Sequence, residues 1–311
     1  MTAPDRAEIV RAVRILRQGG VVAFPTETVY GLGADATNEF AVRRVFRAKG
    51  RPVDHPLIVH LAGIDELGGW ARRVPEPARL LAIACWPGPL TLVLERTARV
   101  IPEVTGGRPT VGIRVPAHPV AQRLLREFGS GIAAPSANRF GQVSPTTAEH
   151  VRDDLGTDVD LVLDGGPSAV GVESTIVDCT TDPPSILRPG AITAIDIGRI
   201  LSEPPPLLGG GPSRAPGMLE SHYAPRCHVV LADTADQAQA LADASAAHGR
   251  RTEVLDPHVA TVDYARNLYQ WLRDADERSI EVLVAVLPPA EGIGHAVRDR
   301  LTKAAAPRPG G

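Results

Sequence analysis

Lys49 and Arg51 are two cations separated by a single residue, in a glycine-containing turn after a segment of helical apolar spacing. An ammonium acts as a point charge and a guanidinium as a planar fork, so this pair could hold a polyphosphate. Exposed lysines and arginines are also the norm on protein surfaces, and an isolated pair of this kind is more often simply solvated. The polar residues elsewhere in the chain decide between these interpretations.

Polar residues follow three predicted buried strands. The apolar run 21–24 ends in a proline, two hydroxyls and a carboxylate, a second run ends in His60, and the run 131–134 is followed by Ser136 and Asn138. Strand ends are where α/β proteins bind ligands. The hydroxyl and the amide would add uncharged hydrogen-bond donors beside a phosphate site.

Two arginines lie on further predicted strands. Residues 110–116 alternate polar and apolar positions, which places Thr110 and Arg114 on one face of a strand. Arg114 is then either a surface charge or a group that reads a carboxylate. Arg188 ends another apolar stretch and is a third candidate cation for phosphate binding.

Ser144 precedes Thr146 and Glu149, whose spacing predicts a helix-capping box. That box gives Thr146 a sufficient structural role and leaves Ser144 available to a ligand. The glycines between residues 165 and 171 would permit close approach of the backbone to a ligand, although glycine is also common in ordinary loops.

The composition is that of a globular α/β protein. In 311 residues, 43% are hydrophobic, enough for a sizeable core, and only 4% are aromatic, so the core is aliphatic. The net charge of -3 argues against general affinity for nucleic acid, although a local basic cleft is compatible with it. The chain lacks the G-x-x-x-x-G-K-[ST] motif, so any ATP site is not a P-loop.

Cys85, Cys179 and Cys227 lie far apart, with no zinc-binding spacing, and we expect reduced thiols and no metal site. The amino terminus alternates charged and apolar residues, and no stretch approaches the about 18 apolar residues of a membrane span. We therefore expect no membrane association, and a cytoplasmic location follows as the default.

Two α/β domains are predicted. Residues 1–198 alternate helical and strand patterns, 199–225 form a linker rich in proline and glycine, and 226–311 alternate strand and helix again. Alternation of this kind in the last segment predicts a small layered sheet with parallel strands.

Residues 25–32, 49–52 and 56–60 closely resemble the opening of the YrdC-like threonylcarbamoyl-AMP synthases, and further matches follow in order along the chain. The resemblance extends over the linker and the carboxy-terminal extension of the longer form of these enzymes. It implies an α/β fold: a YrdC-like domain with a twisted open sheet, followed by a smaller Rossmann-like α/β domain.

The resemblance also implies a nucleotidyltransferase activity. Members combine L-threonine, bicarbonate and ATP into threonylcarbamoyl-AMP and pyrophosphate, as the first step toward threonylcarbamoyladenosine in tRNA. Mg²⁺ is the expected counter-ion of the ATP triphosphate. The tRNA threonylcarbamoyl-transferase machinery is a candidate partner.

Site residues are carried over from the family by matching positions. The resemblance implies that Lys49 and Arg51 are catalytic and that ATP contacts Lys49, Arg51, His55, Thr110, Ser136, Asn138, Ser144, Arg188 and Tyr223. It assigns to L-threonine the residues Thr28, His60, Arg114, Ala134 (through its backbone) and Ser174. His55 departs from the family, whose members commonly carry asparagine there, but an imidazole can still donate one hydrogen bond.

Tyr223 follows the linker, just before the second domain. In the longer form of the family this segment lies over the active site, so Tyr223 would belong to a lid that excludes water. The alternative is that Tyr223 anchors the second domain.

Two other functions are compatible with the sequence. The chain could be a module that binds double-stranded RNA or tRNA weakly and without catalysis; steep salt dependence and no need for threonine would then be expected. It could also be a carbamoyl-transfer enzyme that uses carbamoyl phosphate, but such proteins usually add zinc-finger segments, against which the sparse cysteines argue.

Overall fold

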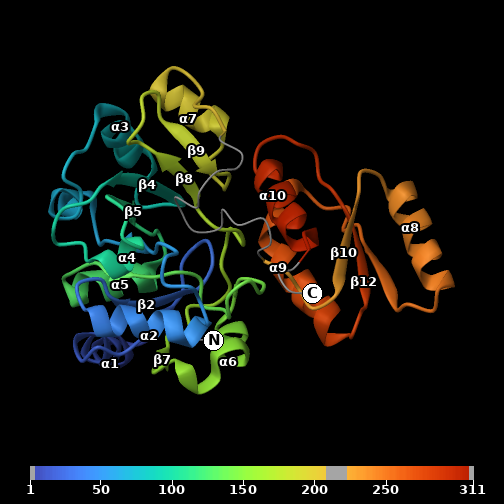
Figure 1. The fold of residues 1–311 in the computed structure, drawn as a ribbon, viewed down its shortest axis with the longest axis horizontal. Coiled ribbons are helices and arrows are strands. Elements are labelled where there is room, and N and C mark those ends of the chain that lie inside the picture. The colour runs from blue at the N-terminus through green and yellow to red at the C-terminus, as the bar shows by residue number, and fades with distance from the viewer. Residues whose placement is uncertain (1–3, 208–222, 308–311) are drawn as a thin grey trace.

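The computed structural model describes residues 4–207 and 223–307, which form two α/β units (Figure 1). The first unit, residues 4–207, is built on a nine-stranded mixed sheet of order β7-β1-β2-β6-β3-β5-β4-β8-β9. The carboxy-terminal unit, residues 228–305, has a three-stranded sheet of order β10-β12-β11. The predicted α/β fold class with a smaller second unit is confirmed.

The strands of the first unit are short, and their pairing aligns two predicted site residues. β3 and β5 run parallel with His60 opposite Arg114, so both side chains lie at the carboxyl ends of neighbouring strands. The strands are β1 Val22–Phe24, β2 Gly31–Asp35, β3 Ile58–His60, β4 Leu90–Glu95, β5 Thr110–Arg114, β6 Ile132–Ala133, β7 Leu161–Val162, β8 Thr175–Asp178 and β9 Ser185–Arg188.

The helices cover this sheet with amphipathic faces. In α1, Asp5 caps the first turn in a capping box with Glu8, and Ile9 and Leu16 on the buried face lie in one hydrophobic cluster with residues of α5. The helices are α1 Arg6–Arg17, α2 Glu39–Lys49, α3 Glu76–Cys85, α4 Pro102–Thr105, α5 Pro119–Phe128, α6 Ala148–Leu155 and α7 Ala194–Leu201, with 3₁₀ turns η1 Ile64–Gly69 and η2 Gly156–Asp158.

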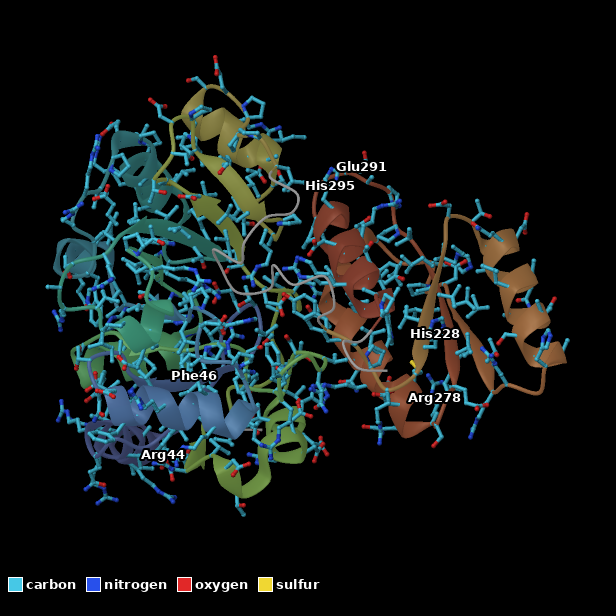
Figure 2. All side chains as sticks on the ribbon, in the orientation of Figure 1. Arg44, Phe46, His228, Arg278, Glu291 and His295 are labelled. Carbon is cyan, nitrogen blue, oxygen red and sulfur yellow. The ribbon has the colours of Figure 1, made fainter. Side chains whose placement is uncertain are left out.

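Helix α2 carries the predicted cation pair at its carboxyl end. Phe46 packs into the core, whereas Arg44 reaches Asp160 at 3.0 Å (Figure 2). Gly50 ends the helix in the left-handed conformation (φ 62°), which glycine adopts without strain. The chain therefore turns sharply between Lys49 and the next cation, and the two side chains enter different surroundings.

The carboxy-terminal unit confirms the predicted parallel sheet. β12 pairs in parallel with both β10 and β11. α9 and α10 lie between this sheet and the first unit, and α8 covers the opposite face (Figure 1). The elements are β10 His228–Ala232, α8 Ala235–Ala247, β11 Thr252–Leu255, α9 Thr261–Glu277, β12 Val282–Val286 and α10 Gly294–Ala305.

The two units share a hydrophobic contact. Val143 and Val172 of the first unit lie in one buried cluster with Leu268 and Tyr269 of α9. Burial of this apolar surface stabilises the docking of the second unit on the first. The two units are therefore packed against each other, in addition to being joined by the linker.

Two details differ from the sequence predictions. The capping box at Thr146 and Glu149 is wrong: α6 begins one residue later, and Thr147 caps it by accepting a hydrogen bond from the His150 N–H. Strand β2 was not predicted. The boundary predicted at residue 198 falls within α7, and much of the predicted linker 199–225 lies outside the described residues, so this division of the chain remains a prediction.

Within the described ranges, no helix combines the length and the apolar character that crossing a membrane requires. Cys85, Cys179 and Cys227 form no disulfide with one another, and Cys179 and Cys227 are buried. Residues 4–207 and 223–307 contain no group of three or more histidine, cysteine, aspartate or glutamate side chains that could hold a metal ion.

Candidate active site

A single pocket brings together members of both predicted binding sets. The loop after β1, the ends of β3 and β5, and the segments around residues 135 and 174 form its wall. From the predicted ATP set, the wall contains Arg51, Ser136, Arg188 and Tyr223. From the predicted threonine set, it contains Thr28, His60, Arg114, Ala134 and Ser174.

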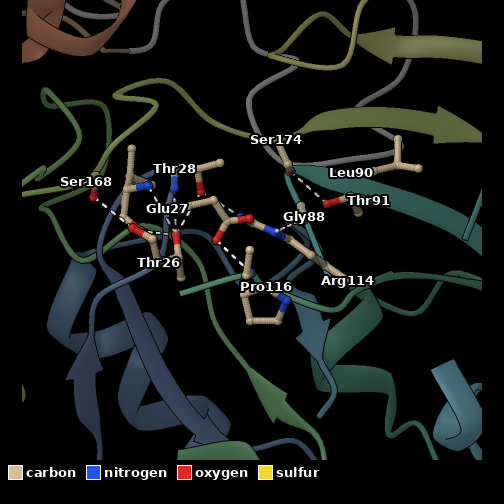
Figure 3. Close-up of polar contacts among 12 residues, drawn as sticks. Thr26, Glu27, Thr28, Gly88, Leu90, Thr91, Arg114, Pro116, Ser168 and Ser174 are labelled. Carbon is tan, nitrogen blue, oxygen red and sulfur yellow. Dashed lines mark hydrogen bonds and ion pairs between the residues drawn. The ribbon is translucent and has the colours of Figure 1, made fainter. Parts of the chain in front are cut away.

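Arg114 is held by three hydrogen bonds on one side of this pocket (Figure 3). Its Nη2 donates to Glu27 Oε1 at 2.7 Å, its Nη1 to Thr28 Oγ1 at 2.8 Å, and its Nε to the Gly88 carbonyl at 3.3 Å. Burial alone would raise the pKa of Glu27, but the Arg114 guanidinium outweighs it and the pKa is lowered. The pair is therefore ionised, and Glu27 fixes the direction in which Arg114 points.

The loop that supplies Glu27 is itself rigid. Thr26 Oγ1 donates to the Val29 carbonyl at 2.6 Å and lies 2.8 Å from Thr28 Oγ1, while Ser168 Oγ donates to the Thr26 carbonyl at 3.0 Å. A hydroxyl that bonds to the backbone a few residues on closes a turn in this way. Thr28 is thus fixed before any ligand arrives.

His60 presents a neutral ring to the pocket. Its Nδ1 lies 3.2 Å from the Ile58 carbonyl, and burial together with the nearby Arg114 charge lowers its pKa to about 3. The Ala134 N–H also bonds to the Ile58 carbonyl, at 2.9 Å, so a ligand would have to use the carbonyl of Ala134. Neither residue adds charge to this side of the pocket.

Arg188 and Ser174, which also line the pocket, are joined by hydrogen bonds. Arg188 donates to the Ser174 carbonyl through Nε at 3.1 Å and through Nη2 at 2.9 Å, and Nη2 also lies 3.1 Å from Ser174 Oγ. Thr91 Oγ1 holds the Ser174 hydroxyl from the other side at 2.8 Å. This arrangement joins a residue of the predicted threonine set to a cation of the predicted ATP set.

Arg51 is a buried cation at the pocket. Its Nη2 donates to the Pro56 carbonyl at 3.1 Å, its guanidinium lies 5.7 Å from the centre of the Phe140 ring, and its buried Nε has no hydrogen-bond partner among the described residues. Burial lowers its pKa to about 10, so it stays charged at neutral pH. A buried charge with an unused donor suits an anionic ligand.

Lys49 has different surroundings from Arg51. Its Nζ donates to the carbonyls of Ser136 (2.6 Å) and Asn138 (2.5 Å) and approaches Asn138 Oδ1 at 3.3 Å. An ammonium has three N–H groups, and these contacts occupy them. Burial lowers the pKa of Lys49 well below its usual range. In this structure Lys49 positions the turn 135–138 and does not line the pocket.

The other predicted ATP residues lie around the pocket, not on its wall. The Asn138 amide donates to the carbonyls of Arg139 and Gln142, and Ser144 Oγ donates to Glu173 Oε1 at 2.6 Å. His55 packs edge-on against Phe140, the ring that also contacts Arg51, with centroids 5.4 Å apart. Burial lowers its pKa.

Thr110 lies at the start of β5, at the end of the strand away from Arg114. Continuing the register in which Ile58 faces Gly112 places Thr110 level with Pro56, whose carbonyl binds Arg51. The two ends of the strand are roughly 13 Å apart, so Thr110 could serve only the Arg51 side of the site.

Buried neutral histidines predict an acid-sensitive fold. The Thr146 N–H donates to His150 Nδ1 at 3.3 Å, and burial with the Arg273 charge lowers the pKa of His150 to about 4. Between pH 6.5 and 4 the unfolded chain binds a proton that the folded chain does not, so stability is full above pH 6.5 and falls as the pH drops. Urea unfolding at pH 7 and pH 5 should show this loss.

His150→Gln should make that pH dependence shallower, because the amide oxygen can accept from Thr146 without titrating. His248→Gln, at an exposed position, is the matched control and should leave the dependence as it is in the unsubstituted chain. Equal slopes in all three proteins would mean that His150 does not contribute.

The fold and pocket define a class of protein: a two-unit α/β protein with buried arginines converging on one pocket beside a rigid strand-end loop. The Sua5_yciO_yrdC family model, described as "Telomere recombination", matches residues 14–190. A second model, "Threonylcarbamoyl-AMP synthase, C-terminal domain", matches residues 192–306. The chain belongs to the Sua5, YciO and YrdC family and has the additional Sua5 carboxy-terminal domain, which confirms the resemblance inferred from its motifs.

Similar proteins match over nearly the whole chain. The threonylcarbamoyl-AMP synthase of Pyrococcus abyssi is 40% identical over 314 residues, covering 94% of this chain and 92% of that protein. The synthase of Bacillus subtilis is 42% identical over 326 residues, covering 97% and 94%. A crystal structure of P. abyssi Sua5 complexed with L-threonine superposes with a TM-score of 0.93 at 38% identity, covering 98% of this chain and 96% of that one.

Proposed function

We propose that this chain is an L-threonylcarbamoyladenylate synthase, a nucleotidyltransferase that forms threonylcarbamoyl-AMP and pyrophosphate from L-threonine, bicarbonate and ATP. The observation that carries the proposal is the shared pocket, in which Arg114 faces the same space as Arg51 and Arg188. The names of the relatives and the threonine complex of P. abyssi Sua5 support it.

The proposed reaction needs no enzyme nucleophile. The threonine amine and bicarbonate form an N-carbamate with loss of water, and a carbamate oxygen then attacks the α-phosphorus of ATP. The bond from the α-phosphorus to the bridging oxygen breaks, and pyrophosphate leaves with the electron pair. Such a transfer depends on in-line positioning and on neutralising the phosphate charge. The held side chains of Arg114, Arg51 and Arg188 suit those two tasks.

Each end of the pocket has a proposed role. Arg114, with Thr28 fixed beside it, would bind the carboxylate of threonine, and Ser174 would contact the threonine near Arg188. Arg51 and Arg188 would bind the triphosphate. Lys49 would act through the turn that carries Ser136.

Mg²⁺ would accompany the triphosphate and lower its negative charge. Among the described residues no acidic cluster is available to hold the ion, so phosphate oxygens and water would supply its ligands, which is the usual preference of Mg²⁺. The adenylate product is an activated acyl donor, and we propose the tRNA threonylcarbamoyl-transferase machinery as its consumer, in the cytoplasm where tRNA is modified.

Pyrophosphate release tests this function. We expect release only when ATP, L-threonine and bicarbonate are all present, because the carbamate is the nucleophile. Equal release with threonine or bicarbonate omitted would refute the synthase. Salt-sensitive binding of double-stranded RNA together with an absence of pyrophosphate would instead support the RNA-binding alternative.

Arg114→Lys should raise the KM for threonine more than the KM for ATP. A lysine ammonium cannot hold Glu27 and present a planar fork to a carboxylate at the same time. Steady-state kinetics with each substrate varied in turn measures the two constants. A larger rise in the KM for ATP would assign Arg114 to the nucleotide.

Tyr223→Phe should lower the yield of threonylcarbamoyl-AMP per ATP consumed. Tyr223 lines the pocket, is buried, and has a positive φ of 63°, a strained conformation for a bulky residue. Its ring also stacks on Tyr269 with centroids 5.7 Å apart, which supports the anchoring role. An unchanged yield with a lowered unfolding midpoint would leave only that anchoring role.

A further inference from the structure

Glu173 is a buried carboxylate on the wall of a pocket that is proposed to bind an anion. Its Oε1 accepts from Ser144 Oγ at 2.6 Å, and its Oε2 accepts from Tyr269 Oη at 2.8 Å and from Arg300 Nε at 2.9 Å. An uncompensated negative charge at this place would repel a triphosphate. The partners of Glu173 therefore matter for the binding of ATP.

Arg300 comes from the other unit, on α10. Its side chain is completely buried, and it donates through Nη1 to the Pro189 carbonyl at 2.8 Å and to Asp299 at 2.8 Å. Its guanidinium also lies 5.4 Å from the centre of the Tyr223 ring. The carboxy-terminal unit thus places a fixed cation directly behind two residues of the pocket wall.

Arg300 and Arg188 both interact electrostatically with the Glu173 carboxylate. Burial alone would raise the pKa of Glu173, but the charges of Arg300 and Arg188 lower it to about 2, so it is ionised at neutral pH. The positive charge of Arg300, which does not line the pocket, compensates the negative charge of Glu173. Without Arg300, that negative charge would instead offset the positive charge that Arg188 contributes to the pocket.

We propose that Arg300 is a positioning residue that the carboxy-terminal unit supplies to the active site, where it neutralises Glu173 and keeps the pocket wall positive enough to bind the triphosphate of ATP. The inference rests on the proposed function. It gives the carboxy-terminal unit a definite task, which is to set the charge of a pocket built almost entirely by the first unit.

The test uses Arg300→Met in the full chain. We expect the KM for ATP to rise by about tenfold or more, because an uncompensated charge acts strongly in a water-poor site, while the KM for threonine changes less than threefold. Glu173→Gln combined with Arg300→Met should return the KM for ATP to within about threefold of the unsubstituted value. A purely structural defect lowers the folded fraction, and hence the apparent kcat, without shifting KM in this pattern.

Arg273→Met is the matched control. Arg273 of α9 also forms an ion pair between the units, partly buried, with Asp154 at 2.6 Å, but neither residue lies on the pocket wall. This variant should lose stability and keep the KM for ATP within twofold.

If Arg300→Met does not fold, Arg300→Lys, which keeps the charge, is compared with the double variant, and both should bind ATP nearly normally.

An unchanged KM for ATP in Arg300→Met would overturn the role of Arg300. If Arg300→Met does not fold, a loss of ATP affinity in Arg300→Lys and in the double variant would overturn it as well. So would a double variant no better than Arg300→Met. These results leave the synthase intact as long as the unsubstituted chain makes product. Failure of the unsubstituted chain to release pyrophosphate from the complete mixture would refute the proposed function itself.

Discussion

Arg51→Ala is expected to lower kcat/KM for ATP by about 30- to 1000-fold, or on the order of 2 to 4 kcal/mol of transition-state stabilisation. Arg51 is buried at the pocket, stays charged, and has a donor that no described residue uses. Alanine removes that charge and leaves water in its place. Steady-state kinetics at varied ATP, with an unfolding curve for each protein, measures the effect.

Arg47→Ala is the control for this substitution, since Arg47 is an exposed arginine on the last turn of α2. It should retain turnover close to that of the unsubstituted chain. If Arg51→Ala also turns over normally and is folded, Arg51 is a buried charge that binds no ligand, and the proposed phosphate site is wrong.

Lys49→Ala is expected to lose activity to a similar extent, again on the order of 2 to 4 kcal/mol, but by another route. The ammonium satisfies the partly buried carbonyl of Ser136 and the buried carbonyl of Asn138, and its removal leaves these acceptors without partners at a cost of up to about 1 to 3 kcal/mol each. The turn then loosens and Ser136 shifts at the pocket wall. Both the unfolding midpoint and the activity should therefore fall.

Stability distinguishes the two cations. Arg51→Ala should affect the kinetics far more than the unfolding midpoint, whereas Lys49→Ala should affect both. Loss of activity in Lys49→Ala with an unchanged midpoint would mean that Lys49 leaves its carbonyl partners and binds ATP directly.

Periodic elements could be predicted from the sequence because their apolar spacing is strong. Helix α1 and the alternating elements of the carboxy-terminal unit were found in this way. Strand β2 was missed because its glycines have low strand propensity and give no alternation. The glycines of β2 are required by tertiary packing. A Cβ on Gly33 would lie 2.7 Å from the Phe24 ring and 2.7 Å from Ile132, so only glycine fits beside them.

The site was predictable to the extent that strand ends converge. His60 and Arg114 end neighbouring strands; the sequence marked His60 as a strand-end residue but placed Arg114 only on one face of a strand. The capping error arose because Thr146 and Thr147 are both good caps, and the sequence does not choose between adjacent threonines.

The electrostatic partners could not be predicted. Glu27 and Arg114 are 87 residues apart, and Glu173 and Arg300 are 127 apart, so no local spacing connects them. The only sequence signal for Glu27 is a carboxylate between two threonines at a strand end. Glu173 and Arg300 gave no signal, because their pairing depends on how α10 docks against the first unit.

Mass spectrometry of the product formed from ATP, L-threonine and isotope-labelled bicarbonate tests the shared pocket most directly. We expect a single adenylate that contains threonine and one labelled carbon, with one pyrophosphate released for each molecule formed. An adenylate of threonine without the labelled carbon would mean that the enzyme activates the threonine carboxylate itself, and this result would contradict the proposed synthase.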